Sequence, residues 1–213
     1  MKKSAIIIGL KGKLLNKSET SFLKSNNPMG VILFARNIDN KLQTIKLVKN
    51  IKTILGRNTM ILIDQEGGRV SRLSKKHWPR FPSAKIFGDI AKDNMNNAKL
   101  ATYKNYKKIG KILFNLGINV NCAPVLDLLF KGSHNVIGDR SFSRDPKIVS
   151  MLALEACKGL ISEGVMPIIK HIPGHGRSKN DSHFVLPEIT SKERELMQDF
   201  YPFTKLNNMP LAM

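Results

Sequence analysis

A histidine-rich segment late in the chain is the part whose residue types could most clearly do chemistry. Residues 170–176 read Lys-His-Ile-Pro-Gly-His-Gly and Asp181-Ser182-His183 follows, so three of the five histidines fall within fourteen residues. Asp181 and His183 are two positions apart, which lets the carboxylate hydrogen-bond the imidazole and hold one tautomer. We therefore predict that Asp181 and His183 form a general acid/base pair that works near neutral pH.

The same histidines leave a metal site open as the alternative. His171 and His175 have the i, i+4 spacing of a zinc-binding helix. However, Pro173 and Gly174 lie between them and disfavour a helix. Zinc could still be held from loops by His171, His175, His183 and Asp181. The alternative function is thus a metal-dependent hydrolase, whereas the main interpretation needs no metal and no other cofactor.

Two further segments carry charged residues suited to a polar ligand. Residues 64–72 begin with Asp64 at the end of an apolar run and contain Arg69 and Arg72. A carboxylate beside two arginines can bind sugar hydroxyls, although the same residues could simply form a salt-bridged loop. In residues 137–143, Arg140 could donate a forked pair of hydrogen bonds to a ligand, or it could lie in a surface turn.

The elements that must position these residues alternate between short apolar runs and amphipathic stretches. The predicted strands are 5–10, 30–34, 60–63, 118–124 and 165–170, with the start of another at 210–213. The predicted helices are 17–25, 40–55, 96–116, 146–163 and 191–203. Nearly continuous apolar strands separated by helices indicate an α/β fold with a parallel sheet that is covered on both faces.

Such a sheet is either an open doubly wound sheet or a (β/α)8 (TIM) barrel. Polar residues follow four of the predicted strands: Arg36-Asn37, Asp64-Gln65-Glu66, Asp127 and Lys170-His171. A barrel places the residues that follow its strands around one rim, which favours the barrel. We expect residues 65–95 and 125–145 to be long functional loops.

The composition limits the class of protein. The chain has 213 residues, which suits one domain, and only two cysteines, Cys122 and Cys157. The net charge is +19, but the excess is mostly lysine spread along the chain, so we expect no nucleic-acid partner. No apolar run approaches the roughly 20 residues that span a bilayer, and no secretion signal is recognisable. We therefore expect a cytoplasmic protein with no membrane partner.

Taken together, the motifs resemble glycoside hydrolase family 3, in its bacterial β-N-acetylhexosaminidase branch. The matching segments are Asp64-Gln65-Glu66-Gly67-Gly68-Arg69-Val70, Ala123-Pro124-Val125-Leu126-Asp127, Gly138-Asp139-Arg140-Ser141-Phe142, residues 170–176 and Asp181-Ser182-His183. They occur in the family's order across essentially the whole chain.

The resemblance implies a TIM barrel and a reaction that removes terminal β-linked N-acetylglucosamine from peptidoglycan fragments. It implies a retaining mechanism with a covalent glycosyl-enzyme intermediate. By this likeness the sugar hydroxyls would be bound by Asp64, Arg72, Arg140, Lys170 and His171. His183, assisted by Asp181, would be the acid/base. The substrate partner would be a small glycan.

The family's nucleophile is an aspartate in a later segment, and no residue within 1–213 matches it. Asp89 and Asp127 fit no such motif. Residues 1–213 are therefore expected to be the N-terminal part of a single barrel domain, C-terminally truncated, with about five to six of its eight strands. Alone, the chain is expected to be inactive or impaired, and its open sheet would admit a complementary C-terminal fragment as a partner.

Overall fold

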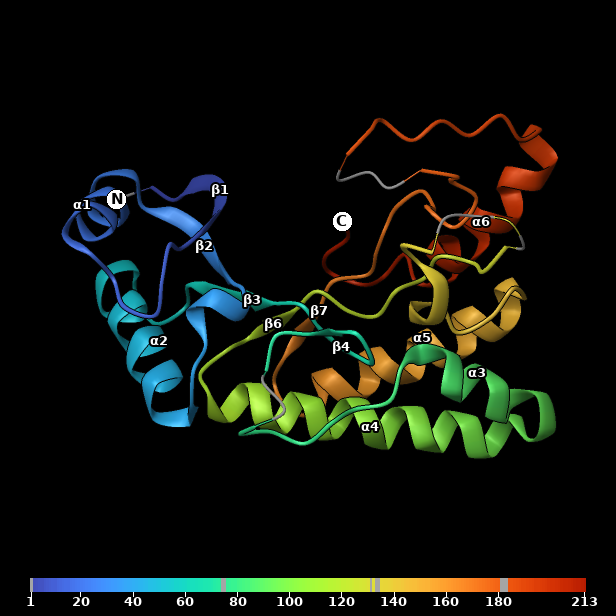
Figure 1. Cartoon of the computed structure of the whole chain (residues 1–213), viewed down its shortest axis with the longest axis horizontal. Helices are drawn as coiled ribbons and strands as arrows, with labels where there is room; N and C mark the ends of the chain where they lie inside the picture. The colour runs from blue at the N-terminus through green and yellow to red at the C-terminus, as the bar shows by residue number, and fades with distance from the viewer. Residues whose placement is uncertain (1, 74–75, 131, 133–134, 181–183) are drawn as a thin grey trace.

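The computed structural model describes residues 2–73, 76–130, 132, 135–180 and 184–213. Five parallel strands form one sheet in the order β1-β2-β3-β6-β7, which runs across the middle of the molecule (Figure 1). The strands are β1 (Ser4–Gly9), β2 (Pro28–Leu33), β3 (Met60–Ile63), β6 (Val120–Asn121) and β7 (Met166–Pro167). The α/β class and the parallel sheet are as predicted.

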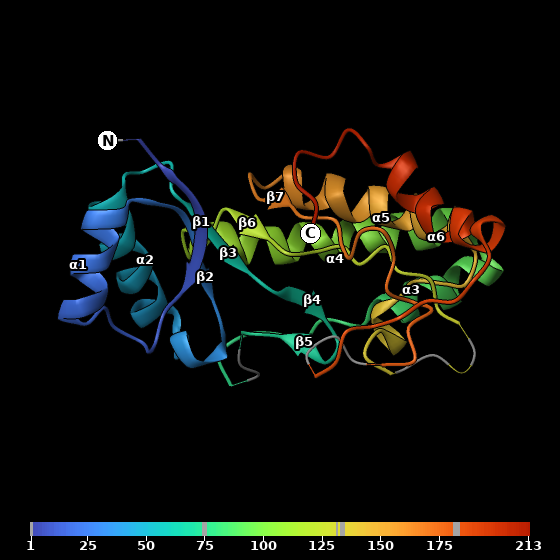
Figure 2. The same ribbon diagram turned by 90° about the horizontal axis from the view of Figure 1, so that it is seen from above.

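Helices pack against the strands and against one another. They are α1 (Lys17–Asn26), α2 (Lys41–Leu55), α3 (Ala84–Asp93), α4 (Met95–Asn115), α5 (Pro146–Ile161) and α6 (Glu193–Lys205). Helix α4 lies along α5, while α1 and α2 lie together at the N-terminal end of the sheet (Figures 1 and 2). Asn16 begins α1 with a capping box, in which its side chain accepts from the Glu19 amide and Glu19 accepts from the Asn16 amide.

The two faces of the sheet are buried in different ways. Ile61 and Ile63 of β3 belong to the main core, which the strands share with the helices. Leu62 lies between them and points the other way, because side chains alternate along a strand. It forms a small second cluster with Val120, Cys122 and Ile168 from the neighbouring strands and the segments that follow them. The strands therefore also bury apolar side chains on the face away from the helices.

The C-terminal residues extend the sheet on the side of β7. Ala212 pairs in parallel with Ile169, and the Met213 amide donates to the Ile169 carbonyl at 2.9 Å. The Ile172 amide in turn donates to the Met213 carbonyl at 2.7 Å. The predicted beginning of a sixth strand is thus present at residues 211–213.

The fourth and fifth strands are shorter than predicted. Regular pairing covers two residues in each of β6 and β7, against six or seven predicted. Pro124 and Pro167 have no amide hydrogen to donate, which interrupts the ladder. An isolated parallel bridge between Val125 and Lys170 continues the same direction, so the chain still delivers Lys170 to the carboxyl edge.

Residues 65–95 are not one long loop, which corrects the sequence interpretation. They contain a small antiparallel hairpin, β4 (Gln65–Gly67) with β5 (Val70–Ser71), and then helix α3. Gly88 lies inside α3 and lowers its helix propensity, which is why the helix was not predicted. A Cβ at Gly88 would collide with the Phe142 carbonyl, so this glycine allows α3 to pack closely on the 138–142 segment. The described residues within 125–145 are mostly loop, with a 3₁₀ turn at Gly138–Arg140.

In the part of the chain that the structure describes, we find no helix with both the length and the apolar character that a bilayer crossing requires.

Candidate functional site

A cavity of about 450 Å³ opens where β3, the segment after β7 and the 136–140 loop meet. The five predicted sugar-binding residues all line it: Asp64, Arg72, Arg140, Lys170 and His171. They come from three separate stretches of sequence, and the parallel sheet brings them together because the carboxyl ends of its strands share one edge. Met213 also lines the cavity.

Asp64 and Lys170 form the floor of this cavity. The Lys170 ammonium is 2.9 Å from one Asp64 oxygen, and Arg72 is 3.3 Å from the other. Only 2% of the Lys170 side chain is exposed. Burial by itself would raise the pKa of Asp64, but the charges and hydrogen bonds of Lys170 and Arg72 outweigh it and hold that pKa below its ordinary value. Asp64 is therefore an ionised acceptor at neutral pH.

Glu66 is a buried member of the site that the sequence analysis did not select. Its carboxylate accepts two parallel hydrogen bonds from Arg140, both at 2.9 Å, and also lies 2.7 Å from the Lys170 ammonium. Burial by itself would lower the pKa of Arg140, but the contact with Glu66 more than reverses this effect. The i, i+2 spacing of Asp64 and Glu66 was the available signal, since alternate residues of an extended chain face the same side.

Asp127, like Glu66, is a site residue for which the sequence patterns predicted no role. It is fully buried, and its carboxylate lies 2.5 Å from Nδ1 of His171 and accepts the His175 amide at 2.7 Å. The other His171 nitrogen, Nε2, lies 3.4 Å from an Arg140 nitrogen, which can only donate. These neighbours favour the tautomer with the proton on Nδ1, so Nε2 is an acceptor beside the cavity.

Arg69 joins two loops at the mouth of the cavity. Its guanidinium donates to Asp139 at 2.8 Å and to the carbonyls of Val136 and Ile137 at 2.9 and 3.1 Å. The β4–β5 turn and the 136–139 loop are thereby fastened together. The sequence left open whether Arg69 and Arg72 bind a ligand or form a salt-bridged loop. Arg72 reaches Asp64 on the cavity floor, whereas Arg69 forms the salt-bridged loop.

The predicted acid/base pair, Asp181 and His183, lies outside the described residues. His175 lines the cavity, and its ring packs edge-on against that of His171, with centroids 6.2 Å apart. Within the described residues, neither ring nitrogen of His175 has a hydrogen-bond partner, and no group of three metal-binding side chains occurs. The predicted set of three histidines includes His183, so the described residues do not test it. No helix joins His171 to His175, as expected.

Arg36 and Asn37, which were also expected at the rim, have a structural role instead. The Arg36 guanidinium donates to the Leu10 carbonyl at 2.8 Å. The Asn37 amide donates to the carbonyls of Leu10 and Gly12. Both residues fasten the end of β1 to the end of β2, and neither lines the cavity.

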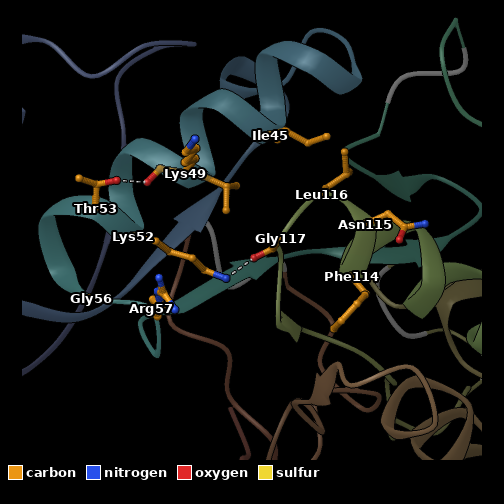
Figure 3. Close-up of a pocket in the computed structure, with 11 residues that line it drawn as sticks. Ile45, Lys49, Lys52, Thr53, Gly56, Arg57, Phe114, Asn115, Leu116 and Gly117 are labelled. Carbon is orange, nitrogen blue, oxygen red and sulfur yellow. Dashed lines mark hydrogen bonds between the residues drawn. The ribbon is translucent and has the colours of Figure 1, made fainter.

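A larger cavity of about 710 Å³ lies elsewhere, between the ends of α2 and α4 (Figure 3). Lys49, Lys52 and Arg57 line it, and Lys52 donates to the Gly117 carbonyl at 2.7 Å. None of the predicted site residues is part of it. A choice of site by cavity volume alone would therefore have selected this cavity instead of the one lined by the convergent charged groups.

Comparisons with known proteins identify the family of the chain. Residues 7–212 match the family model described as the glycosyl hydrolase family 3 N-terminal domain. A β-hexosaminidase of Bordetella avium is 34% identical over 195 residues, which is 91% of this chain. The structure of NagZ from Neisseria gonorrhoeae in complex with N-trifluoroacetyl-D-glucosamine superposes with a TM-score of 0.93, at 34% identity and over 99% of this chain. A second NagZ structure from that organism, in complex with a zinc ion, has a TM-score of 0.92 at 33% identity, over 99% of this chain and 62% of its own.

The chain spans only part of the length of these relatives. It covers 55% of the Bordetella protein and 63% of the NagZ chain that holds the glucosamine analogue.

Proposed function

Since the chain belongs to the glycosyl hydrolase family 3 N-terminal domain family, we propose that its 450 Å³ cavity binds a terminal, non-reducing N-acetylglucosamine residue. The observation that carries the proposal is the convergence of Asp64, Arg72, Arg140, Lys170 and His171 on that cavity. A relative of high structural similarity is described as bound to an N-acylated glucosamine, which supports the same ligand class.

The charged groups suit sugar hydroxyls because each is fixed before the ligand arrives. Ionised Asp64 offers only acceptors, while Arg72, Arg140 and Lys170 offer only donors. Glu66 holds both Arg140 and Lys170, so these cations lose little side-chain freedom when a hydroxyl replaces water. A ring whose neighbouring hydroxyls both donate and accept is complementary to this set.

We also propose that the sheet is part of a TIM barrel. The second apolar cluster, formed by Leu62, Val120, Cys122 and Ile168 on the face away from the helices, fits a barrel interior. Residues 211–213 pair in parallel beside Ile169 and would form the sixth strand of the barrel. In this proposal, further strands would lie between that strand and β1. The single-domain organisation of residues 1–213 stays part of the same proposal.

For the whole protein we propose hydrolysis of terminal β-linked N-acetylglucosamine from peptidoglycan fragments, in the cytoplasm, with retention of configuration. A carboxylate nucleophile would bond to the anomeric carbon while the leaving oxygen departs and takes a proton from His183. His183 would then accept a proton from water as that water displaces the carboxylate. Asp181 would hold the imidazole in the required tautomer. By resemblance, the nucleophile belongs to a segment without a counterpart in residues 1–213.

Titration with N-acetylglucosamine tests the binding proposal directly. We expect Arg72→Gln to weaken binding about tenfold or more, because it removes charge-assisted hydrogen bonds to the ligand and leaves Asp64 with one cation fewer. The matched control is Arg57→Gln, the same change at an exposed arginine outside the cavity. Equal affinity for the two variants, measured by calorimetry, would contradict the proposal.

A polypeptide of residues 1–213 alone is expected to bind the sugar without turning over a chromogenic N-acetylglucosaminide. The covalent intermediate needs a nucleophile that these residues do not supply, so the barrier rises by many kcal/mol. Turnover that persists through purification and is abolished in a His183→Ala variant would refute this expectation. Retained sugar binding would separate a lost nucleophile from a failure to fold.

The metal-dependent alternative has one observation in its favour, since a solved relative is described as a zinc complex. His171 and His175 have the ligand types that zinc prefers. Metal analysis and chelation of the active whole protein distinguish the two functions. Loss of activity on chelation, restored by zinc, would favour the metal hydrolase, whereas unchanged activity is expected for the glycosidase.

A further inference from the structure

A groove of about 590 Å³ lies outside the candidate active site, between α4 and the 79–82 segment that precedes α3. Its walls combine apolar surface from Phe81, Ala101 and Ile112 with cations. The cationic side chains are Arg80, Lys104, Lys108 and Lys111. No acidic side chain lines the groove, and it shares no lining residue with the 450 Å³ cavity.

These four cations have no ion-pair partner among the described residues. Lys104, Lys108 and Lys111 have the i, i+4, i+7 spacing of one helix face, so their charges repel one another. Lys107 of the same helix, by contrast, faces Glu163 at 3.8 Å. Unpaired positive charge gathered around a hollow creates a local potential that attracts anions.

The cations of the larger cavity in Figure 3 have a local explanation that those of this groove lack. Lys52 lies in the last turn of α2 and donates to the carbonyl of Gly117, just past the end of α4 (Figure 3). Carboxyl ends of helices carry partial negative charge, which cations there neutralise. Lys104 and Lys108 lie in the middle of α4, away from either end.

Asn105 supplies a second, independent observation. It lines the groove between Lys104 and Lys108 in sequence, is only 9% exposed, and its Nδ2 has no acceptor among the described residues. Buried donors are nearly always satisfied, because an unmade hydrogen bond leaves the full desolvation cost uncompensated. Because Nδ2 is closed off from solvent, a neighbouring side chain would have to move aside before a ligand oxygen in the groove could provide the missing acceptor.

We propose that this groove is a binding site for an organic phosphate with an apolar or aromatic body. The phosphate would lie among Arg80, Lys104 and Lys108, since guanidinium and ammonium groups are its usual partners. The apolar body would pack on Phe81 and Ile112, and Asn105 would donate to an oxygen of the ligand. The same chemistry occurs in a free phosphate ester and in the headgroup region of an anionic lipid.

Phenyl phosphate, inorganic phosphate and phosphatidylglycerol vesicles are the probes. For a free ester, we expect phenyl phosphate to bind more tightly than inorganic phosphate, because only the ester also buries an apolar group. Sedimentation with phosphatidylglycerol vesicles but not phosphatidylcholine vesicles, without binding of phenyl phosphate, would identify a lipid headgroup. Binding of neither probe overturns the proposal.

Two sets of variants separate this site from the general basicity of the chain. Lys104→Gln with Lys108→Gln is expected to weaken probe binding about tenfold or more, as two charge-assisted contacts are lost. The control is Lys41→Gln with Lys46→Gln, the same change of charge on exposed lysines of α2. An equal loss of probe affinity in the two double variants would mean that net charge alone attracts the probe, and would overturn the proposed site.

Asn105→Leu tests the buried amide. The two side chains are similar in size, and leucine removes an unsatisfied buried donor, so the melting temperature should stay the same or rise. Probe affinity should nevertheless fall several-fold. A variant with unchanged stability and unchanged affinity would refute the role of Asn105, and retained N-acetylglucosamine binding would show that the active-site cavity is intact.

Discussion

At the scale of single residues, buried carboxylates behind the cavity support the basic side chains that line it. Lys170, Arg140 and His171 face the ligand space, and each is held from behind or beside by a carboxylate. Glu66 holds the first two, and Asp127 holds the third. Breaking a buried pair leaves an uncompensated charge, so the supporting carboxylates matter for both stability and ligand geometry.

Asp127→Ala is expected to lower the free energy of unfolding by about 3 kcal/mol, because it leaves His171 Nδ1 and the His175 amide without their acceptor. Urea denaturation measures this change. Asp39→Ala is the control, since it removes an exposed carboxylate that pairs with Lys13 and accepts a hydrogen bond from Asn40 at the surface, and we expect little effect there. Equal losses in the two variants would contradict the bracing role of Asp127.

The depressed pKa of Asp64 sets a direction for the acid dependence of stability. Its folded pKa lies below the ordinary 3.8, so the ionised carboxylate stabilises the fold above that value. The contribution is lost as pH falls through the folded pKa. Asp64→Asn should therefore be less stable than the parent at neutral pH, with the difference shrinking below pH 3.8.

Thermal unfolding of both proteins across this pH range is the measurement. A stability gap that widens towards acid would show that the carboxylate is not held ionised by Lys170 and Arg72. Asp93→Asn, at an exposed position near the end of α3, is the matched control and should track the parent at every pH.

At the scale of elements, helix α3 and the 138–142 segment position Arg140 together. They touch so closely at Gly88 that a methyl group there would overlap the Phe142 carbonyl. Gly88→Ala is expected to destabilise the protein by about 1–3 kcal/mol, the usual range for overpacking, despite the better helix propensity of alanine.

The measurement for Gly88→Ala is the melting temperature together with N-acetylglucosamine affinity, because displacement of this segment would also move Arg140. Gly12→Ala provides the comparison, since no atom lies within 4 Å of a Cβ built there. We expect Gly12→Ala to leave both quantities almost unchanged. A stable Gly88→Ala protein with full affinity would refute the packing argument.

Sequence patterns predicted most of the helices and strands, but they missed helix α3 and two residues of the site. The apolar runs at 30–34 and 60–63 identified β2 and β3 because such runs suit strands buried on both faces. Helix α3 was missed because a tertiary contact, not helix propensity, requires Gly88. Asp64, Arg72, Arg140, Lys170 and His171 line one cavity, and their sugar-binding role stays a prediction. Glu66 and Asp127 were not selected, since their partners are about 40 to 105 positions away in sequence and only the fold joins them.

At the scale of the whole molecule, the sheet has two edges. Within the described residues, β1 pairs only with β2, and residues 211–213 pair only on the side of Ile169. Ile6 and Ile7 of β1 are 42% and 45% exposed. Unprotected edges with apolar side chains promote association between chains.

A purified polypeptide of residues 1–213 is therefore expected to self-associate, or to be rescued by a fragment that supplies the remaining strands of the proposed barrel. Sizing chromatography with light scattering measures this. Replacing Ile7 by lysine should reduce association, because a charged side chain on an edge strand opposes pairing. A monodisperse monomer with a cooperative melting transition would contradict the expectation.

The burial of Lys170 makes its amine a reporter of motion at the cavity floor, even though the protein has many other lysines. Its amine is sealed between two acids at the floor of the cavity, whereas lysines such as Lys104 and Lys108 lie open to reagent. Under brief acetylation followed by peptide mass mapping, Lys170 should be among the last amines to be labelled. The rate at which it becomes modified would then record how often the cavity floor opens, with no need for a turnover assay.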